Sequence, residues 1–200
     1  MGDEEVKNQL KLSQQLVMTP QLQLAIQLLA TPSRELPAVI APWVAEHAAA
    51  LAPLAIGEPD PADEVAPPLA LFDSSPFGGG ADSDADIWVL DEPPRVRANG
   101  RAFPRYRVVG DNRDAVWLVR ALRQRARTYL LVAQAALELR PELSGPAPTD
   151  VKPIGLRELA TAVELHESTI SRVAAGCRFR TLHGLYAFAA HKRKLVVTAA

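Results

Sequence analysis

Residues 155–176 read GLRELATAVELHESTISRVAAG, and this stretch decides the fold that the sequence predicts. Its first half predicts a short amphipathic helix, because apolar residues recur at helical spacing, at Leu156, Leu159, Ala160 and Val163. Residues 164–166 have the length of a turn. Residues 167–175 predict a second helix, with Ile170 and Val173 pointing inward. The stretch therefore predicts a helix-turn-helix over 155–176.

The outer side of the second helix carries side chains suited to DNA. The N-terminal part of such a helix enters the major groove, where an arginine can donate two parallel hydrogen bonds to guanine and a serine or threonine can reach a phosphate or a base edge. Arg172 is the candidate for base reading. The alternative is an ordinary helical hairpin without a DNA partner. The predicted DNA-binding residues are His166, Glu167, Ser168, Thr169, Ser171, Arg172, Arg178 and Arg180.

Charge divides the chain into two halves. Residues 1–94 carry three Lys/Arg against fifteen Asp/Glu, a net charge of −12, whereas residues 95–200 carry nineteen against eight, a net charge of +11. Such a basic half predicts an anionic partner, with nucleic acid first. Together with Arg178 and Arg180, the cluster at 192–194 would neutralise phosphates, so we expect binding to weaken steeply with salt.

The N-terminal part is rich in Leu and Gln. Thr19 followed by Pro20 is typical of a helix start, so two short helices are predicted within residues 8–30, separated at Thr19. On the second helix, Leu22, Ile26 and Leu29 form one apolar stripe. Helices this short need a partner surface to be stable.

The middle of the chain is interrupted by proline. Eleven of the seventeen prolines fall within residues 31–94. We predict a broken helix in 34–56 and a disordered acidic linker over 57–86. Weak alternation over 87–110 predicts a small hairpin with its turn near Asn99-Gly100.

The most regular apolar periodicity of the chain lies in residues 112–139, which predict one long helix. Its arginines are expected on the exterior, at Arg113, Arg120, Arg123, Arg125 and Arg127. Two interpretations of this basic helix remain open, a strut along the DNA backbone or a solvated face of a bundle.

Together these elements predict a mostly α fold: short N-terminal Leu/Gln helices, a disordered acidic linker, and a long helix followed by a helix-turn-helix domain. The expected divisions are an N-terminal regulatory region over 8–50, the linker, and a DNA-binding domain over 87–192.

Several classes of protein are not expected. A single cysteine, Cys177, excludes an intramolecular disulfide and fits a reducing, cytoplasmic location. We find no signal peptide and no apolar stretch long enough for a membrane. His166 and Ser168 lack an aspartate positioned to complete a hydrolase triad, and the histidines show no metal-ligand spacing, so we expect no enzyme activity, metal or cofactor.

Two segments resemble the sigma-54 RNA polymerase factors. HESTISRV (residues 166–173) is similar to the helix-turn-helix of that family, and LKLSQQLVMTPQLQLAIQLL (10–29) is similar to its N-terminal regulatory region. A weaker similarity, VWLVRALRQRARTYLLVAQA (116–135), resembles the extra-long helix that precedes the helix-turn-helix. The segments occur in the family's order.

The resemblance implies a transcription initiation factor that is not an enzyme. Arg172 falls on the arginine that reads the downstream GC promoter element. The N-terminal region would contact an activating AAA+ ATPase and the promoter fork, and core RNA polymerase is the further implied partner. The implied activator-contacting residues are Leu12, Gln14, Gln15, Leu16, Met18, Thr19, Pro20, Gln21, Leu22 and Ile26.

The sequence also departs from the family pattern. The family's core-polymerase-binding domain is not found between the linker and the long helix, and the C-terminal box that reads the upstream GG element is not found, so a shortened member is expected. TLHG (181–184) replaces a Pro-Arg-Gly motif, and Cys177-Arg178 replaces a Lys-aromatic pair. Two alternatives remain: a decoy that binds the activator or the promoter without recruiting polymerase, and a decayed copy with no stable fold.

Overall fold

The computed structural model describes residues 18–55, 58, 71–72, 76–77, 84–90 and 95–200. The α-helices of this part are α2 (Pro20–Ala30), α3 (Leu36–Glu46), α4 (Arg113–Leu139), α5 (Leu156–Ala162) and α6 (Glu167–Gly176). The strands are β1 (Leu51–Pro53), β2 (Leu71–Phe72), β3 (Ile87–Leu90), β4 (Arg95–Asn99), β5 (Tyr106–Val108), β6 (Ile154–Gly155), β7 (Arg178–Thr181), β8 (Gly184–His191) and β9 (Lys194–Ala199).

A mixed β-sheet overturns the predicted mostly α fold. Seven strands pair in the order β2-β4-β3-β7-β8-β9-β6, and β1 and β5 form a separate antiparallel pair. β3 and β7 run parallel, with Ile87 opposite Phe179, although about ninety residues separate them in the sequence. The helices α5 and α6 therefore pack against a β-sheet, and they do not form a helix-turn-helix domain that consists of helices alone.

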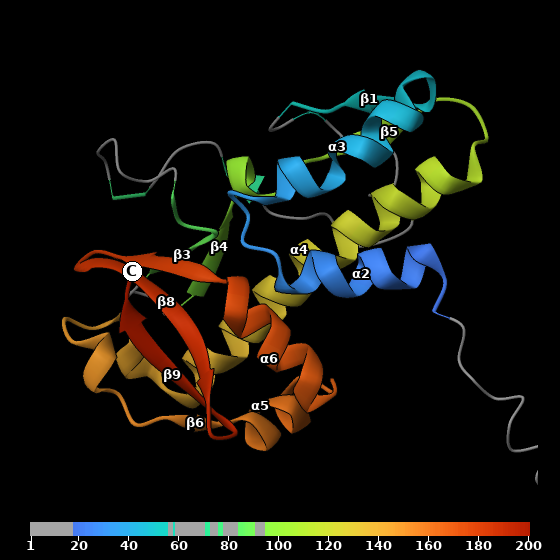
Figure 1. Ribbon diagram of the computed structural model, residues 1–200. Coiled ribbons are helices and arrows are strands. Elements are labelled where there is room, and N and C mark those ends of the chain that lie inside the picture. Colours follow the sequence, from blue (N-terminus) through green and yellow to red (C-terminus); the bar gives the residue numbers. More distant parts are fainter. Residues whose placement is uncertain (1–17, 56–57, 59–70, 73–75, 78–83, 91–94) are drawn as a thin grey trace, which may run out of the picture.

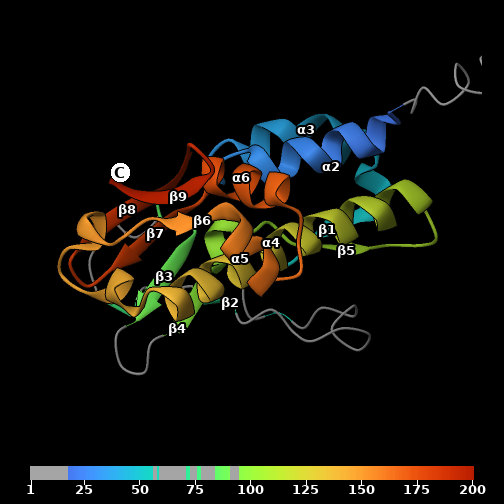
Figure 2. The same cartoon turned by 90° about the horizontal axis from the view of Figure 1, so that it is seen from below.

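The predicted long helix is confirmed, and it connects the two hydrophobic cores (Figures 1 and 2). The side chain of Asn112 caps the helix by accepting a hydrogen bond from the amide of Ala115 at 2.9 Å. The N-terminal half of α4 packs against α2 and α3 through Leu118 and Leu122. Its C-terminal half packs against α5, α6 and the sheet through Tyr129 and Ala133.

The second of the two predicted N-terminal helices is confirmed, but its buried face differs from the predicted stripe. Thr19 caps α2 by accepting from the amide of Leu22 at 3.2 Å. Leu24 and Leu28 are buried, whereas Leu22 is 41% exposed. Because leucines lie on more than one side of this helix, spacing alone did not identify which of them are buried. The first predicted helix lies largely outside the described residues.

The predicted broken helix and hairpin turn also need correction. α3 is one continuous helix with Pro42 inside it. β3 and β4 do form an antiparallel hairpin, but the chain reverses between Leu90 and Arg95. Asn99 has φ −74°, and its side-chain amide donates to the carbonyl of Ala85 at 2.7 Å, so it anchors the end of β4 and makes no turn with positive φ.

Most of the predicted linker, 57–86, lies outside the described residues. At its C-terminal end, Ala85 and Asp86 are buried. Within the described part of the chain, none of the helices is long and apolar enough to cross a membrane.

Candidate nucleic-acid interface

The turn between α5 and α6 is held by two backbone hydrogen bonds. The amide of Leu165 donates to the carbonyl of Ala160 at 3.0 Å, and that of Glu164 to Thr161 at 3.4 Å. This is the Schellman arrangement that ends many helices, and it places Glu164 at φ 54°. Ile170 and Val173 are fully buried beneath α6, as the sequence predicts. Burial of these two residues fixes which side of α6 faces outward.

Three polar side chains form a chain of hydrogen bonds over the first turns of α6. His166 caps the helix, because its Nδ1 accepts from the amide of Ser168 at 3.2 Å. The same nitrogen lies 2.8 Å from the Ser168 hydroxyl, and that hydroxyl accepts from Nη1 of Arg172 at 3.4 Å. In the described part of the chain, no ion pair is recorded for Arg172, and its one hydrogen bond to Ser168 uses one of the five N–H donors of the guanidinium.

The other predicted DNA-binding residues fall into two groups. Glu167, Thr169 and Ser171 lie on α6 beside Ser168 and are half-buried. Arg178 and Arg180 lie beyond the C-terminal end of α6, on β7. Because strand residues alternate and Phe179 faces the helices, these two arginines project from the other face of the sheet. The structure thus brings His166–Arg172 together and leaves the β7 arginines apart.

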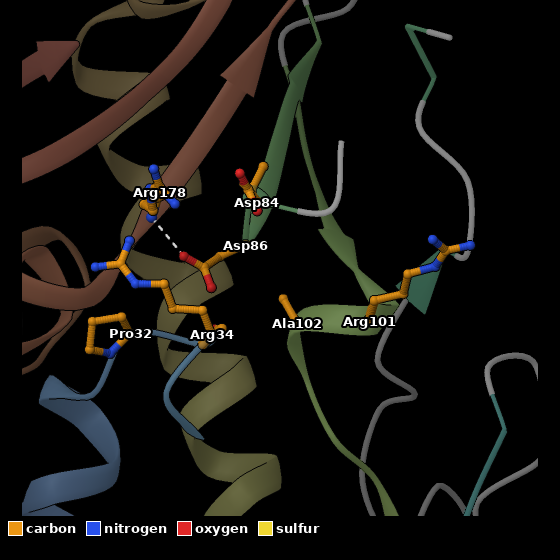
Figure 3. A pocket seen from close by; sticks show the side chains of 9 residues that line it. Pro32, Arg34, Asp84, Asp86, Arg101, Ala102 and Arg178 are labelled. Carbon is orange, nitrogen blue, oxygen red and sulfur yellow. Dashed lines mark hydrogen bonds between the residues drawn. The ribbon is translucent and has the colours of Figure 1, made fainter. Parts of the chain in front are cut away.

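A small pocket of about 70 Å³ borders Arg178 (Figure 3). Asp86 lies in its wall, and its Oδ2 accepts from the backbone amide of Arg178 at 2.7 Å. Burial raises the pKa of this carboxyl, while hydrogen bonds from Ser33 and the Arg178 amide act in the opposite direction. Figure 3 shows the Arg34 side chain on the same side as Arg178 and the Arg101 side chain directed away from Asp86. No local pattern around Asp86 predicts that this acid is buried.

Arg125 of α4 is buried, contrary to the exterior position predicted for it. Its Nε donates to the carbonyl of Leu28 at 2.7 Å, and its Nη2 donates to Thr31 at 2.9 Å and to the Ser33 hydroxyl at 3.0 Å. The guanidinium also lies 4.2 Å from the ring centroid of Tyr129. Arg125 therefore donates to the carbonyl of Leu28 in the last turn of α2 and to that of the C-cap residue Thr31, at a helix end whose carbonyls lack partners within the helix.

α6 approaches the same end of α2. A Cβ added to Gly176 would lie 3.1 Å from the carbonyl oxygen of Ala30 and 2.5 Å from the Tyr129 hydroxyl. Tyr129 itself donates to the carbonyl of Leu29 at 3.1 Å. Side chains of α4 and the backbone of α6 thus meet at the C-terminal end of α2, which we call the α2 junction.

The predicted activator-contacting residues that the structure describes lie at the start of α2 and along it, and they differ in exposure. Met18 and Leu22 are exposed to 42% and 41%, and Ile26 is half-buried. Thr19 and Pro20 start the helix, and Gln21 donates to a carboxylate oxygen of Asp114 at 2.8 Å. Leu12, Gln14, Gln15 and Leu16 lie outside the described residues.

Comparison with known proteins finds two family models, one that matches the C-terminal region with α6 and one that matches the N-terminal region with α2. A family model described as "Sigma-54, DNA binding domain" matches residues 108–194, which include α4, α5 and α6. A second, described as "Sigma-54 factor, Activator interacting domain (AID)", matches residues 8–46, which include α2 and α3. The chain therefore belongs to a class of factors that combine a DNA-binding domain with an activator-interacting domain.

Several curated relatives are named RNA polymerase sigma-54 factors. The RNA polymerase sigma-54 factor of Acidithiobacillus ferridurans is 40% identical over 75 residues, which are 38% of this chain and 16% of that protein. The corresponding factor of Vibrio anguillarum is 36% identical over 115 residues, 52% of this chain and 24% of that protein. That of Bacillus subtilis is 37% identical over 125 residues, 52% and 29% respectively. The chain belongs to the sigma-54 factor family, and it matches less than a third of the length of these relatives.

Proposed function

We propose that this chain binds promoter DNA as a sigma-54-type transcription initiation factor, with α6 reading the downstream GC element. The observation that carries the proposal is the outer side of α6, where Arg172 is held by Ser168 above the buried Ile170 and Val173. A guanidinium in this position suits the O6 and N7 atoms of guanine in the major groove. The family match over 108–194 supports the same assignment.

In this proposal the N-terminal region contacts the activator. The exposed Met18 and Leu22 offer an apolar contact for an AAA+ ATPase. In this proposal ATP hydrolysis belongs to that activator and not to this chain. Core RNA polymerase is the third partner in the proposal.

The test replaces Arg172 with alanine and measures binding to duplexes that differ in one base step of the GC element, at fixed salt. We expect Arg172→Ala to cost about 1–3 kcal/mol on the GC duplex and to relax the preference at one step, because the bidentate contact is lost. Arg157→Ala removes an exposed arginine of the neighbouring α5 and should leave the preference unchanged. Equal discrimination by Arg172→Ala and the unaltered chain would contradict base reading by α6.

A second function rests on the segment 47–107, which neither family model matches. A chain with activator-binding and DNA-binding regions but no polymerase contact would act as a decoy that occupies the activator or the promoter. Pull-down of core polymerase distinguishes the two functions. Retention of polymerase favours the initiation factor, whereas DNA binding without polymerase favours the decoy.

A further inference from the structure

The turn that joins β8 and β9 carries consecutive cations into solvent. His191 pairs with Lys194 across the hairpin, which leaves Lys192 and Arg193 as a two-residue turn. Residues 191–194 are all exposed. Among the described residues no ion pair is recorded for Lys192 or Lys194, and the side chain of Arg193, 85% exposed, pairs with Glu167. We call residues 192–194 the β8–β9 tip.

The backbone of the tip is unusual for the side chains it carries. Lys192 has φ 44° and Arg193 has φ 62°. Two positive φ values identify a type I′ turn, for which Asn-Gly is the favoured pair because other residues are strained there. Long cationic side chains therefore occupy positions at which stability alone favours others. An outlier of this kind points to a role for the side chains themselves.

The tip is fixed beside the helices of the candidate interface. The amide of Leu156, the first residue of α5, donates to the carbonyl of Arg193 at 2.9 Å, and Gly155 pairs with Lys194. Nη2 of Arg193 lies 3.4 Å from a carboxylate oxygen of Glu167, in the first turn of α6. Figure 1 shows the end of the hairpin beside β6 and α5. The tip and the N-terminal end of α6 thus hold a defined position relative to each other.

We propose that the β8–β9 tip is a second DNA contact, in which Lys192 and Lys194 bind phosphates that flank the groove entered by α6. This inference rests on the DNA binding proposed above and adds a surface to it. The family model for the DNA-binding domain ends at residue 194, so β9, which holds the tip in place, lies almost entirely beyond that match. Lysine ammonium groups bind phosphates as point charges without reading sequence. The tip therefore adds affinity and leaves base preference to Arg172.

The experiment titrates the full chain with a fluorescein-labelled duplex that carries the GC element and with a scrambled duplex, at several salt concentrations. Lys192→Ala combined with Lys194→Ala should weaken binding about tenfold on both duplexes and lower the slope of log affinity against log salt by about 2, since each phosphate contact contributes about 0.9. Arg95→Ala combined with Lys152→Ala removes the same charge from exposed positions that the proposal does not place at the DNA, and it should change affinity less than twofold.

A second variant separates charge from turn structure. Lys192→Asn combined with Arg193→Gly suits the type I′ turn, so the melting temperature should stay the same or rise while affinity still falls severalfold. Unchanged binding by both tip variants, or an equal loss in the Arg95 and Lys152 control, overturns the tip contact while the α6 proposal stands. An unaltered chain that binds neither duplex overturns both proposals.

Discussion

The α2 junction and the outer side of α6 use polar side chains in opposite ways. At the junction Arg125 is 1% exposed and donates to Leu28, Thr31 and Ser33. On α6 the corresponding guanidinium, that of Arg172, is half-buried and has one long hydrogen bond within its own helix. A buried charge needs hydrogen-bond partners inside the protein, whereas the DNA contact proposed for Arg172 requires donors that are not already used within the protein. The first arginine therefore contributes to stability, and the second contributes little.

The largest effect is expected at Arg125. Arg125→Met should lower the free energy of unfolding by about 3–5 kcal/mol, because it leaves the carbonyls of Leu28 and Thr31 without this donor and removes a positive charge that favours ionised Asp86. Urea unfolding followed by circular dichroism measures the change. Arg120→Met, at an exposed position of the same helix, should stay within about 0.5 kcal/mol. Similar values for the two variants would show that burial does not distinguish them.

The next effect concerns Asp86 and appears as a change with pH. Because burial raises the pKa of this carboxyl above 3.8, the folded protein keeps its proton over a range in which the unfolded chain has lost it. The unfolded state then binds fewer protons, so this group makes the protein less stable as pH rises through that range. Asp86→Asn removes the contribution, since its side-chain oxygen can still accept from the Arg178 amide.

Urea unfolding at a series of pH values, starting near pH 4, measures this contribution. The stability of Asp86→Asn relative to the unaltered protein should rise with pH and then level off. A constant difference between the two proteins would mean that the carboxyl is not perturbed.

The smallest effect belongs to the turn beside α6. Glu164 adopts φ 54° at the position where Schellman turns favour glycine. Glu164→Gly should therefore raise the free energy of unfolding by about 0.5–1 kcal/mol, because it removes the strain of a side chain in the left-handed region. Thermal unfolding measures it, and binding to the GC duplex should not change. Lower stability would show that the Glu164 side chain has a role in the turn.

The sequence predicted the helices better than the sheet. α4, α5 and α6 were predictable because their apolar residues repeat at helical spacing over a whole segment. Strands β7, β8 and β9 were missed, because RFRT alternates over only four residues and GLYAFAAH and KLVVTA show little regular alternation between apolar and polar residues. The parallel pairing of β3 with β7 joins segments far apart in the sequence, which no local pattern reveals.

The candidate site was predicted in part for the same reason. The spacing of Ile170 and Val173 located the outer side of α6, whose composition then singled out Ser168 and Arg172. Helical spacing places Arg125, seven residues after Leu118, on the buried side of α4 and Arg120 on the exposed side. The spacing does not reveal what stabilises a buried arginine there, because its acceptors come from the end of α2, about a hundred residues earlier. Tertiary packing also separated Arg178 and Arg180 from the start of α6.

Gly176 has a consequence for cooperativity. It is the last residue of α6, and it leaves no room for a side chain between that helix and the carbonyl of Ala30. The regions matched as activator-interacting and DNA-binding thus meet closely at Gly176, and the guanidinium of Arg125 also joins them. If the first region detached, the buried guanidinium of Arg125 in the second region would lose its hydrogen-bond acceptors. The two regions should therefore melt in a single transition and exchange their amide hydrogens as one unit.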